Sequence, residues 1–245
     1  MKAFFITFIS ISFNLIAFSQ TEKKCNDDYS DLNEFGLNGK VKTIETSIFA
    51  FDNTKEIKEN IETMNSSNWF NKTIVYYNKN GNIDSLYVNY LNPKDSKQIE
   101  KLQINYSYNR NIRNGITLEK KNNLTSKTLK NWIKRDTYDE STYSKEGTLL
   151  KVETTVLNHC YQISARNIKI VDHRLSSGKH LKYIFDDHNH LTKVTVNYEN
   201  NNETEDLSKI YIAFDNLNNP VTVINVFEKK GFINKDISFI KYTYY

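Results

Sequence analysis

The sequence predicts an all-β fold, an antiparallel meander of repeated β-hairpins that curls into a twisted open sheet or half-barrel. Two observations predict it: apolar and polar residues alternate with period two in many short runs, and a seven-residue turn pattern recurs between runs. The composition agrees, because 16 Tyr and 14 Phe occur in a chain of 245 residues that is only 38% hydrophobic. Aromatic and β-branched side chains suit a half-buried pleated surface.

The chain begins with a segment typical of export. Lys2 gives it a positive start, an apolar run extends from Ala3 to Phe18, and small residues then offer a signal-peptidase site. We interpret residues 1–19 as a cleaved signal peptide. The alternative is a transmembrane anchor, but an anchor needs about 20 apolar residues and this run is shorter and interrupted. We therefore expect a protein of the periplasm, cell surface or medium, with no membrane span after cleavage.

The charge excludes one class of partner. The chain carries 33 Lys and Arg against 29 Asp and Glu, a formal net charge of +4. This excess is too small and too evenly spread for a nucleic-acid-binding surface, so we expect no nucleic-acid partner.

The two cysteines, Cys25 and Cys160, remain in the exported chain. An oxidising compartment permits a disulfide between them. Two unpaired thiols are the equal alternative, because pairing depends on a geometry that the sequence does not show.

The mature chain reads as an N-terminal tail or short helix over 20–36, followed by one hairpin-repeat domain over 37–245. Alternation is clearest in Leu149–Val156 and Lys193–Tyr198. Two segments are ambiguous. Ile57, Ile61 and Met64 give Lys55–Asn65 a helical spacing, and Leu124–Ile133 fits either a helix or a strand.

The repeat consists of an aromatic residue, Asx or Ser, two polar residues, Gly or Asn, a polar residue and an apolar one. The copies are Tyr77–Ile83, Tyr143–Leu149, Phe185–Leu191 and Phe214–Pro220. The Gly or Asn supplies a positive φ, and the preceding Asx or Ser bonds a backbone N–H two residues on. Each copy is therefore predicted to be a hairpin turn.

This unit resembles the YD (RHS-type) repeat, in which a Tyr-Asp pair, a Gly turn and a following strand recur. Together with the opening Gly36–Lys42, it also resembles small secreted proteins of Bacteroidota-type bacteria. The resemblance covers most of residues 37–245, although Asp survives only at Asp52, Asp186 and Asp215. It implies a β-hairpin architecture and brings no catalytic residue with it.

Candidate metal ligands gather in one turn, where Asp186, His188 and His190 occur together. Carboxylate and imidazole are metal-binding groups, but a third fixed ligand is missing and polar residues are ordinary in a turn. The sequence implies no cofactor and contains no nucleophile motif, so we expect a protein that is not an enzyme. The alternative is an envelope hydrolase or metal-dependent enzyme with a site near Asp186–His190.

Tyrosines within strands are the candidate ligand-binding residues, with Tyr183 and Tyr211 first among them. Exposed Tyr beside Lys and Asn suits saccharide or protein binding, whereas cross-strand packing explains the same residues without a ligand. We expect an exported binding protein for an envelope glycan or protein, acting across a Tyr-rich face or along an exposed strand edge. A structural envelope protein is a further alternative. An outer-membrane barrel is disfavoured, because Lys241 interrupts the apolar face of the last strand.

Overall fold

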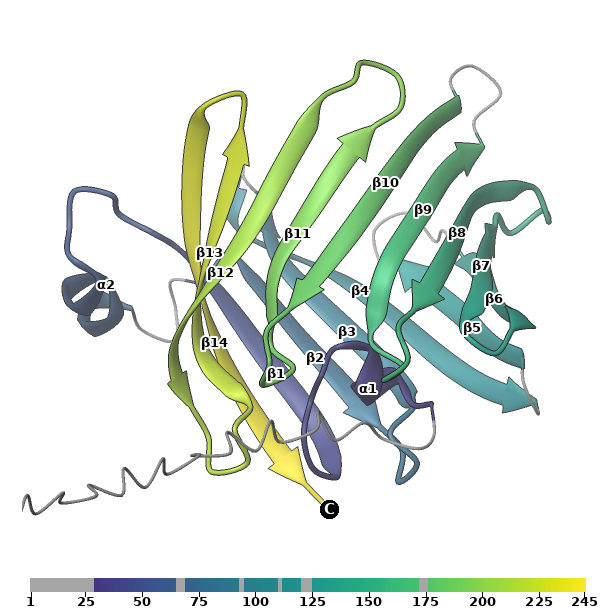
Figure 1. The fold of residues 1–245 in the computed structure, drawn as a ribbon, viewed down its shortest axis with the longest axis horizontal. Helices are drawn as coiled ribbons and strands as arrows, with labels where there is room; N and C mark the ends of the chain where they lie inside the picture. The colour runs from purple at the N-terminus through teal and green to yellow at the C-terminus, as the bar shows by residue number, and fades with distance from the viewer. Residues whose placement is uncertain (1–28, 65–68, 93–94, 110–111, 120–124, 172–175) are drawn as a thin grey trace, which may run out of the picture.

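The computed structural model describes residues 29–64, 69–92, 95–109, 112–119, 125–171 and 176–245. These residues form two short helices and fourteen strands (Figure 1). The helices are α1 (Asp31–Glu34) and α2 (Ile57–Thr63). The strands, in chain order, are β1 (Val41–Ala50), β2 (Asn71–Tyr77), β3 (Ile83–Asn92), β4 (Asp95–Asn109), β5 (Ile112–Glu119), β6 (Thr125–Lys134), β7 (Thr137–Tyr143), β8 (Leu149–Leu157), β9 (Ile163–Val171), β10 (Ser176–Phe185), β11 (Leu191–Tyr198), β12 (Thr204–Phe214), β13 (Pro220–Lys229) and β14 (Phe232–Tyr244).

Each strand pairs antiparallel with the next one along the chain, so the sheet is a meander. The first strand also pairs with the last. Ile44 of β1 lies opposite Tyr242 of β14 on one side and opposite Val75 of β2 on the other. Over the described strands the sheet is therefore a closed barrel. The predicted all-β meander of curled hairpins is confirmed. The pairing of β1 with β14 goes beyond that prediction and satisfies the backbone groups that an edge would leave free.

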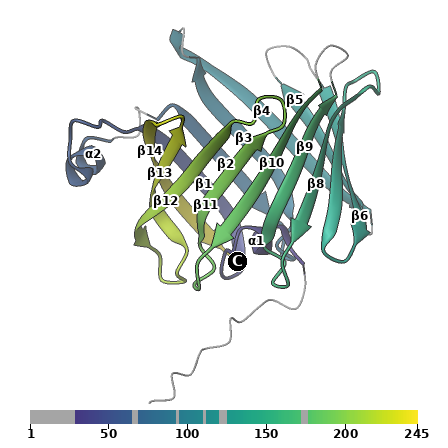
Figure 2. The ribbon, with the colours of Figure 1, turned by 45° about the horizontal axis from the view of Figure 1, so that its top comes forward.

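The inner side of the barrel is identified by α1, which lies between the two walls (Figure 2) and contacts Lys130 of β6. Residues alternate between the two sides along a strand, and paired residues share a side. Following the pairing around the ring from Lys130 gives the other inward residues. Their aliphatic members in the described strands include Ile44, Ile48, Val75, Leu86, Val88, Leu181, Val194, Val196, Leu207, Val223 and Ile240.

The outer side carries charge on most strands, by the same register. The outward charged residues include Glu45, Lys72, Lys127, Asp139, Lys169, Lys182, Lys193, Asp206, Glu228 and Lys241. Several form ion pairs across neighbouring strands, such as Lys193 Nζ with Asp206 Oδ2 at 2.8 Å and Lys72 Nζ with Glu45 Oε1 at 2.7 Å.

Five hairpin turns in the described residues share one hydrogen-bond pattern. A side-chain oxygen accepts the backbone N–H groups of the residues two and four positions later, and the residue three positions later has a positive φ. The accepting residues are Asn78, Ser144, Asn158, Asp186 and Asp215. The positive-φ residues are Gly81, Gly147, Tyr161, Asn189 and Asn218.

Four of these turns are the predicted copies, so the repeat is a structural unit in which one short side chain organises the turn. The fifth, between β8 and β9, does not show in the sequence pattern. There Tyr161 takes the position of Gly or Asn, with φ at 59°. Such a conformation is uncommon for a residue with a bulky side chain, so the pattern of residue types does not identify this turn.

The ambiguous segments are now assigned. Lys55–Asn65 contains α2, in agreement with its helical spacing, whereas Leu124–Ile133 falls largely in β6. The predicted tail over 20–36 contains α1, all four residues of which are buried. No helix within the described ranges is both long and apolar enough to cross a membrane.

We predict that Asp215→Ala costs more stability than the matched turn variant Ser144→Ala. Both lose two hydrogen bonds to turn backbone, but Asp215 also accepts a hydrogen bond from the Tyr244 hydroxyl. We expect losses of about 2–3 and about 1 kcal/mol in the free energy of unfolding, measured by urea denaturation. Equal losses would contradict this assignment.

The Asp215 contribution should also depend on pH. Burial alone would raise the pKa of Asp215, but hydrogen bonds from Tyr244 and the turn backbone outweigh it and lower that pKa. The stabilisation is then complete at neutral pH and is lost as the pH falls below about 4, through the lowered pKa. The difference between wild type and Asp215→Ala should shrink over that range.

Candidate functional site

One end of the barrel is crossed by residues 29–40, which we call the plug (Figure 2). The plug binds the β2–β3 turn, because Leu32 N donates to Gly81 O at 3.1 Å. It also binds the β12–β13 turn, because Asn38 N donates to Asn219 Oδ1 at 2.7 Å and Asn219 Nδ2 donates to Asn38 O at 2.9 Å. Backbone and amide groups therefore fasten the plug to the barrel at two separate turns.

The plug approaches a third turn closely at Gly36. Its φ is +68°, and a Cβ there would lie 1.9 Å from the carbonyl oxygen of Asn189 in the β10–β11 turn. Only glycine combines this conformation with this approach. The sequence analysis places Gly36 at the end of a tail, whereas the structure places it in a contact between chain segments.

A buried ion cluster joins the plug to the barrel wall. Lys130 Nζ lies 3.1 Å from Glu34 Oε1 and 3.3 Å from Asp31 Oδ1, and the Lys130 side chain is 3% exposed. The same ammonium lies 3.7 Å from the centre of the Tyr138 ring, and the Tyr138 hydroxyl donates to Glu34 Oε1 at 2.7 Å. Tyr29 adds its hydroxyl to the same cluster. Every charge here has an opposite charge or a hydrogen-bond partner, as burial of charge requires.

Arg166 of β9 extends this cluster inward, with its Nε 3.2 Å from Thr155 Oγ1. Burial would lower the pKa of Arg166, but the nearby Tyr183, Tyr138 and Glu153 outweigh it and raise that pKa. Burial, and next the Glu34 carboxylate, raise the pKa of Tyr138. The arginine thus stays cationic beside neutral phenols and helps to balance the two carboxylates of α1.

The predicted metal ligands belong to a turn. Asp186 Oδ1 accepts the N–H groups of His188 and His190, which is the shared turn pattern. His190 Nδ1 lies 3.2 Å from Asp186 Oδ2, and His190 Nε2 lies 2.9 Å from the carbonyl oxygen of Asn218. Within the described part of the chain, no three His, Cys, Asp or Glu residues are placed to hold a metal ion. His190 instead links the β10–β11 and β12–β13 turns.

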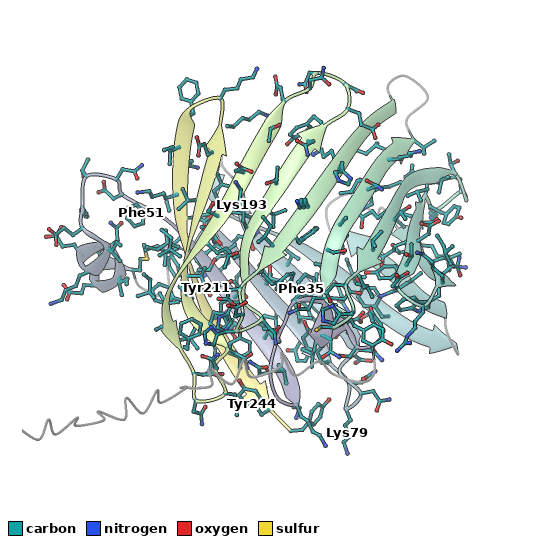
Figure 3. All side chains as sticks on the ribbon, in the orientation of Figure 1. Phe35, Phe51, Lys79, Lys193, Tyr211 and Tyr244 are labelled. Atoms are coloured by element: carbon teal, nitrogen blue, oxygen red, sulfur yellow. The ribbon has the colours of Figure 1, made fainter. Side chains whose placement is uncertain are left out.

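The predicted ligand-binding tyrosines, Tyr183 and Tyr211, both face the barrel interior rather than an outer surface. The Tyr211 hydroxyl donates to the carbonyl oxygen of Leu191, and its ring lies 5.3 Å from that of His190. Tyr211 and Tyr244 both lie toward the plugged end (Figure 3). Burial raises the pKa of Tyr183 and of Tyr211. Ligand binding by these residues stays a prediction.

A polar row crosses the inner side of β12, β13 and β14, farther from the plug. Lys209 lies opposite Asn225, and Asn225 lies opposite Asp236. Asn225 Nδ2 donates to Asp236 Oδ1 at 2.5 Å and to Ser238 Oγ at 2.9 Å. Burial lowers the pKa of Lys209 and raises that of Asp236. The sequence analysis does not identify this row, although Leu207-Ser208-Lys209-Ile210-Tyr211 places a lysine among the apolar residues of an alternating strand.

Cys160 lies buried in the β8–β9 turn and is disulfide-bonded. Cys25, the other cysteine of the sequence, and the predicted signal peptide over 1–19 lie outside the described residues.

Comparison with known proteins identifies no family. No family model matches the chain, and no curated protein matches it. The resemblance to YD repeats is therefore not confirmed. A solved structure of a porin-like protein from Bacteroides uniformis aligns with 83% of this chain and 98% of its own, at 8% identity and a TM-score of 0.39.

We predict that Lys130→Met destabilises the protein strongly, because it leaves Asp31 and Glu34 buried without their ammonium. Breaking a buried ion pair in this way costs about 3–5 kcal/mol. The matched control is Lys127→Met, an exposed outward residue on the same strand, which should change stability by less than about 0.5 kcal/mol. Urea denaturation of both variants measures the difference, and similar midpoints would contradict the structural role of the cluster.

We predict a Cys25–Cys160 disulfide. The protein denatured without reductant should react with no thiol reagent, and its non-reduced digest should contain one peptide pair joining the two cysteines. Mass spectrometry of this digest gives the answer, and recovery of two alkylated cysteines without reduction would rule the bond out.

Proposed function

We propose that this protein is an exported, non-catalytic β-barrel that binds an apolar or amphipathic small molecule in its interior. The observation that carries the proposal is the partial exposure of inward aliphatic residues. Leu181, Val196 and Leu207 face inward, yet none is fully buried. A barrel of about eight strands fills its interior with its own side chains, and wider barrels enclose more space. The half-buried aliphatic residues of this wider barrel offer that space a binding surface.

The distribution of polarity supports an interior site. A barrel that faces lipid carries its apolar side chains outward. Here the outward side mixes charges, among them the Lys193–Asp206 pair, with exposed aliphatic residues such as Ile184 and Ile210. The charges interrupt any apolar band on the outer side, whereas Leu181, Val196 and Leu207 give the interior a half-buried aliphatic surface.

The plug sets the direction of access. Residues 29–40 cross the end that holds the β2–β3, β10–β11 and β12–β13 turns. The ligand then enters at the opposite end, near the β11–β12 and β13–β14 hairpins (Figure 1). Localisation in the cell envelope is part of this proposal and rests on the signal peptide that the sequence predicts over residues 1–19.

An envelope glycan is the second candidate ligand. Tyr106, Tyr183 and Tyr198 lie on the inner side, where their rings and hydroxyls suit a saccharide. Binding along a strand edge, which the sequence analysis expected as one mode, lacks an edge in the described sheet. The alternative of an enzyme near Asp186–His190 is less well supported, because both ring nitrogens of His190 already contact other groups of the fold.

We predict that Leu207→Glu weakens ligand binding while its neighbour Ser208→Glu does not. Leu207 faces inward and Ser208 outward on the same strand, so the variants add the same charge to opposite sides. A carboxylate on the inner wall should weaken the binding of a dansyl-labelled fatty acid by more than about tenfold, because it places a charge on the aliphatic contact surface. Fluorescence titration measures both variants.

Two controls complete this experiment. Circular dichroism establishes that both variants fold, and a soluble envelope oligosaccharide is titrated in parallel. An equal loss of fatty-acid affinity in the two variants, or no fatty-acid binding by the wild type, would contradict the proposal. Binding of the oligosaccharide alone would favour the glycan instead.

A further inference from the structure

We propose that Lys209 is the anion-binding group of the barrel interior and that the ligand is an amphipathic monocarboxylate, with an alkyl chain and one carboxylate end. This inference rests on the proposed function and specifies the ligand class. It follows from three observations: Lys209 has no ion pair among the described residues, the nearby acidic residues bind other groups, and aliphatic residues lie next to it.

Lys209 differs from Lys130 and Lys151, two other inward lysines, in having no counter-ion. Lys130 has Asp31 and Glu34, and Lys151 Nζ lies 2.9 Å from Glu153 Oε1. Within the described residues, Lys209 makes no ion pair within 4.0 Å, and its ammonium has no side-chain hydrogen-bond partner. Lys209 is half-buried, so its ammonium is only partly hydrated and would gain from contact with an anion.

The nearest acids are already engaged with other groups. Asp236 of β14 accepts from Asn225, which lies between it and Lys209 in the polar row. Glu205, two residues along the same strand, accepts from the Tyr198 hydroxyl at 2.8 Å. Tyr211, on the other side along the strand, donates to backbone. These are the titratable groups of β11, β12 and β14 that face Lys209, and none of them pairs with its charge.

Burial lowers the pKa of Lys209, and the attraction of Asp236 only partly opposes this effect. The ammonium is therefore less stable here than in water and gains more from an added negative charge. A bound carboxylate would hold Lys209 in its charged form. This coupling predicts a binding affinity that depends on pH.

The surface next to Lys209 suits an alkyl chain. Leu207 lies two positions before it on the inner side of β12, and Val194 of β11 lies opposite Leu207. Val223, two positions before Asn225 on β13, also faces inward. Val194 and Val223 are buried while Leu207 is half-buried, so the aliphatic surface continues from the wall into the interior. One cation beside such a surface fits a single carboxylate at the end of a chain.

The test compares decanoate with decanol, which share chain length but not charge, as competitors of the neutral probe N-phenylnaphthylamine. The protein is the full mature chain, residues 20–245. We expect Lys209→Met to lower the binding affinity for decanoate by about tenfold or more, since a hydrogen bond to a charged group contributes on this scale. The binding affinity for decanol should change by less than about twofold, because decanol makes only the aliphatic contacts.

Two further variants separate this role from a general effect of charge. Lys193→Met removes the same charge from the outward side, where Lys193 pairs with Asp206 (Figure 3), and should leave both affinities unchanged. Lys209→Arg should keep decanoate binding. Raising the pH toward the ordinary pKa of lysine should lower the affinity of the wild type for decanoate. It should not lower that of Lys209→Arg, because arginine stays charged.

The outcomes are distinguishable. If the wild type binds neither competitor, the proposed function fails and this inference fails with it. If both bind and Lys209→Met leaves the ratio of the two affinities unchanged, the interior site stands and the role of Lys209 is overturned. Selective loss of decanoate with rescue by Lys209→Arg supports the inference.

Discussion

The antiparallel pairing of β1 with β14 is the constraint on which the rest of the structure depends. A meander with period-two alternation has two different faces, and only closure turns one of them into an interior. Once Ile44 lies opposite both Tyr242 and Val75, the inward residues of all described strands face a common space. The other face becomes the outer surface, where charges such as Lys193 and Asp206 pair across strands. The location of the candidate binding surface follows directly from this closure.

The plug is held across one end of the barrel by a buried ion cluster rather than by strand pairing. Its short helix contributes little by itself, since four residues form about one turn. Two carboxylates from that turn meet Lys130, and Arg166 and Tyr138 complete the cluster. A buried cluster of this kind adds less net stability than its attractions imply, but it fixes position, because any displacement separates charges in a poorly solvated site. Hydrogen bonds to two turns then hold the plug across that end of the barrel.

The sequence predicts the local parts of this structure and not the long-range ones. The hairpin turns follow from chemistry within seven residues, as at Asp215 and Asn218, and are found where the repeat places them. Closure depends on strands at opposite ends of the chain, and alternation does not reveal it. The inward position of Tyr183 and Tyr211 depends on that closure and escaped prediction for the same reason. Tyr161 occupies a turn position that usually holds Gly or Asn, and Lys209 is a charged residue on the inner side of a strand. The role of each can be inferred only from its surroundings in three dimensions.

The pairing of the two end strands also determines when the molecule can be completed. Thr43 and Thr243, which face each other in the closing pair, lie 200 positions apart, whereas the hairpins join near neighbours. Contacts between distant positions form late and slow folding, since the loop between them loses much conformational freedom. During synthesis, β1 therefore emerges long before its last partner and exposes an unpaired edge throughout that interval. The finished barrel hides a surface that the nascent chain must protect from aggregation until its last residues arrive.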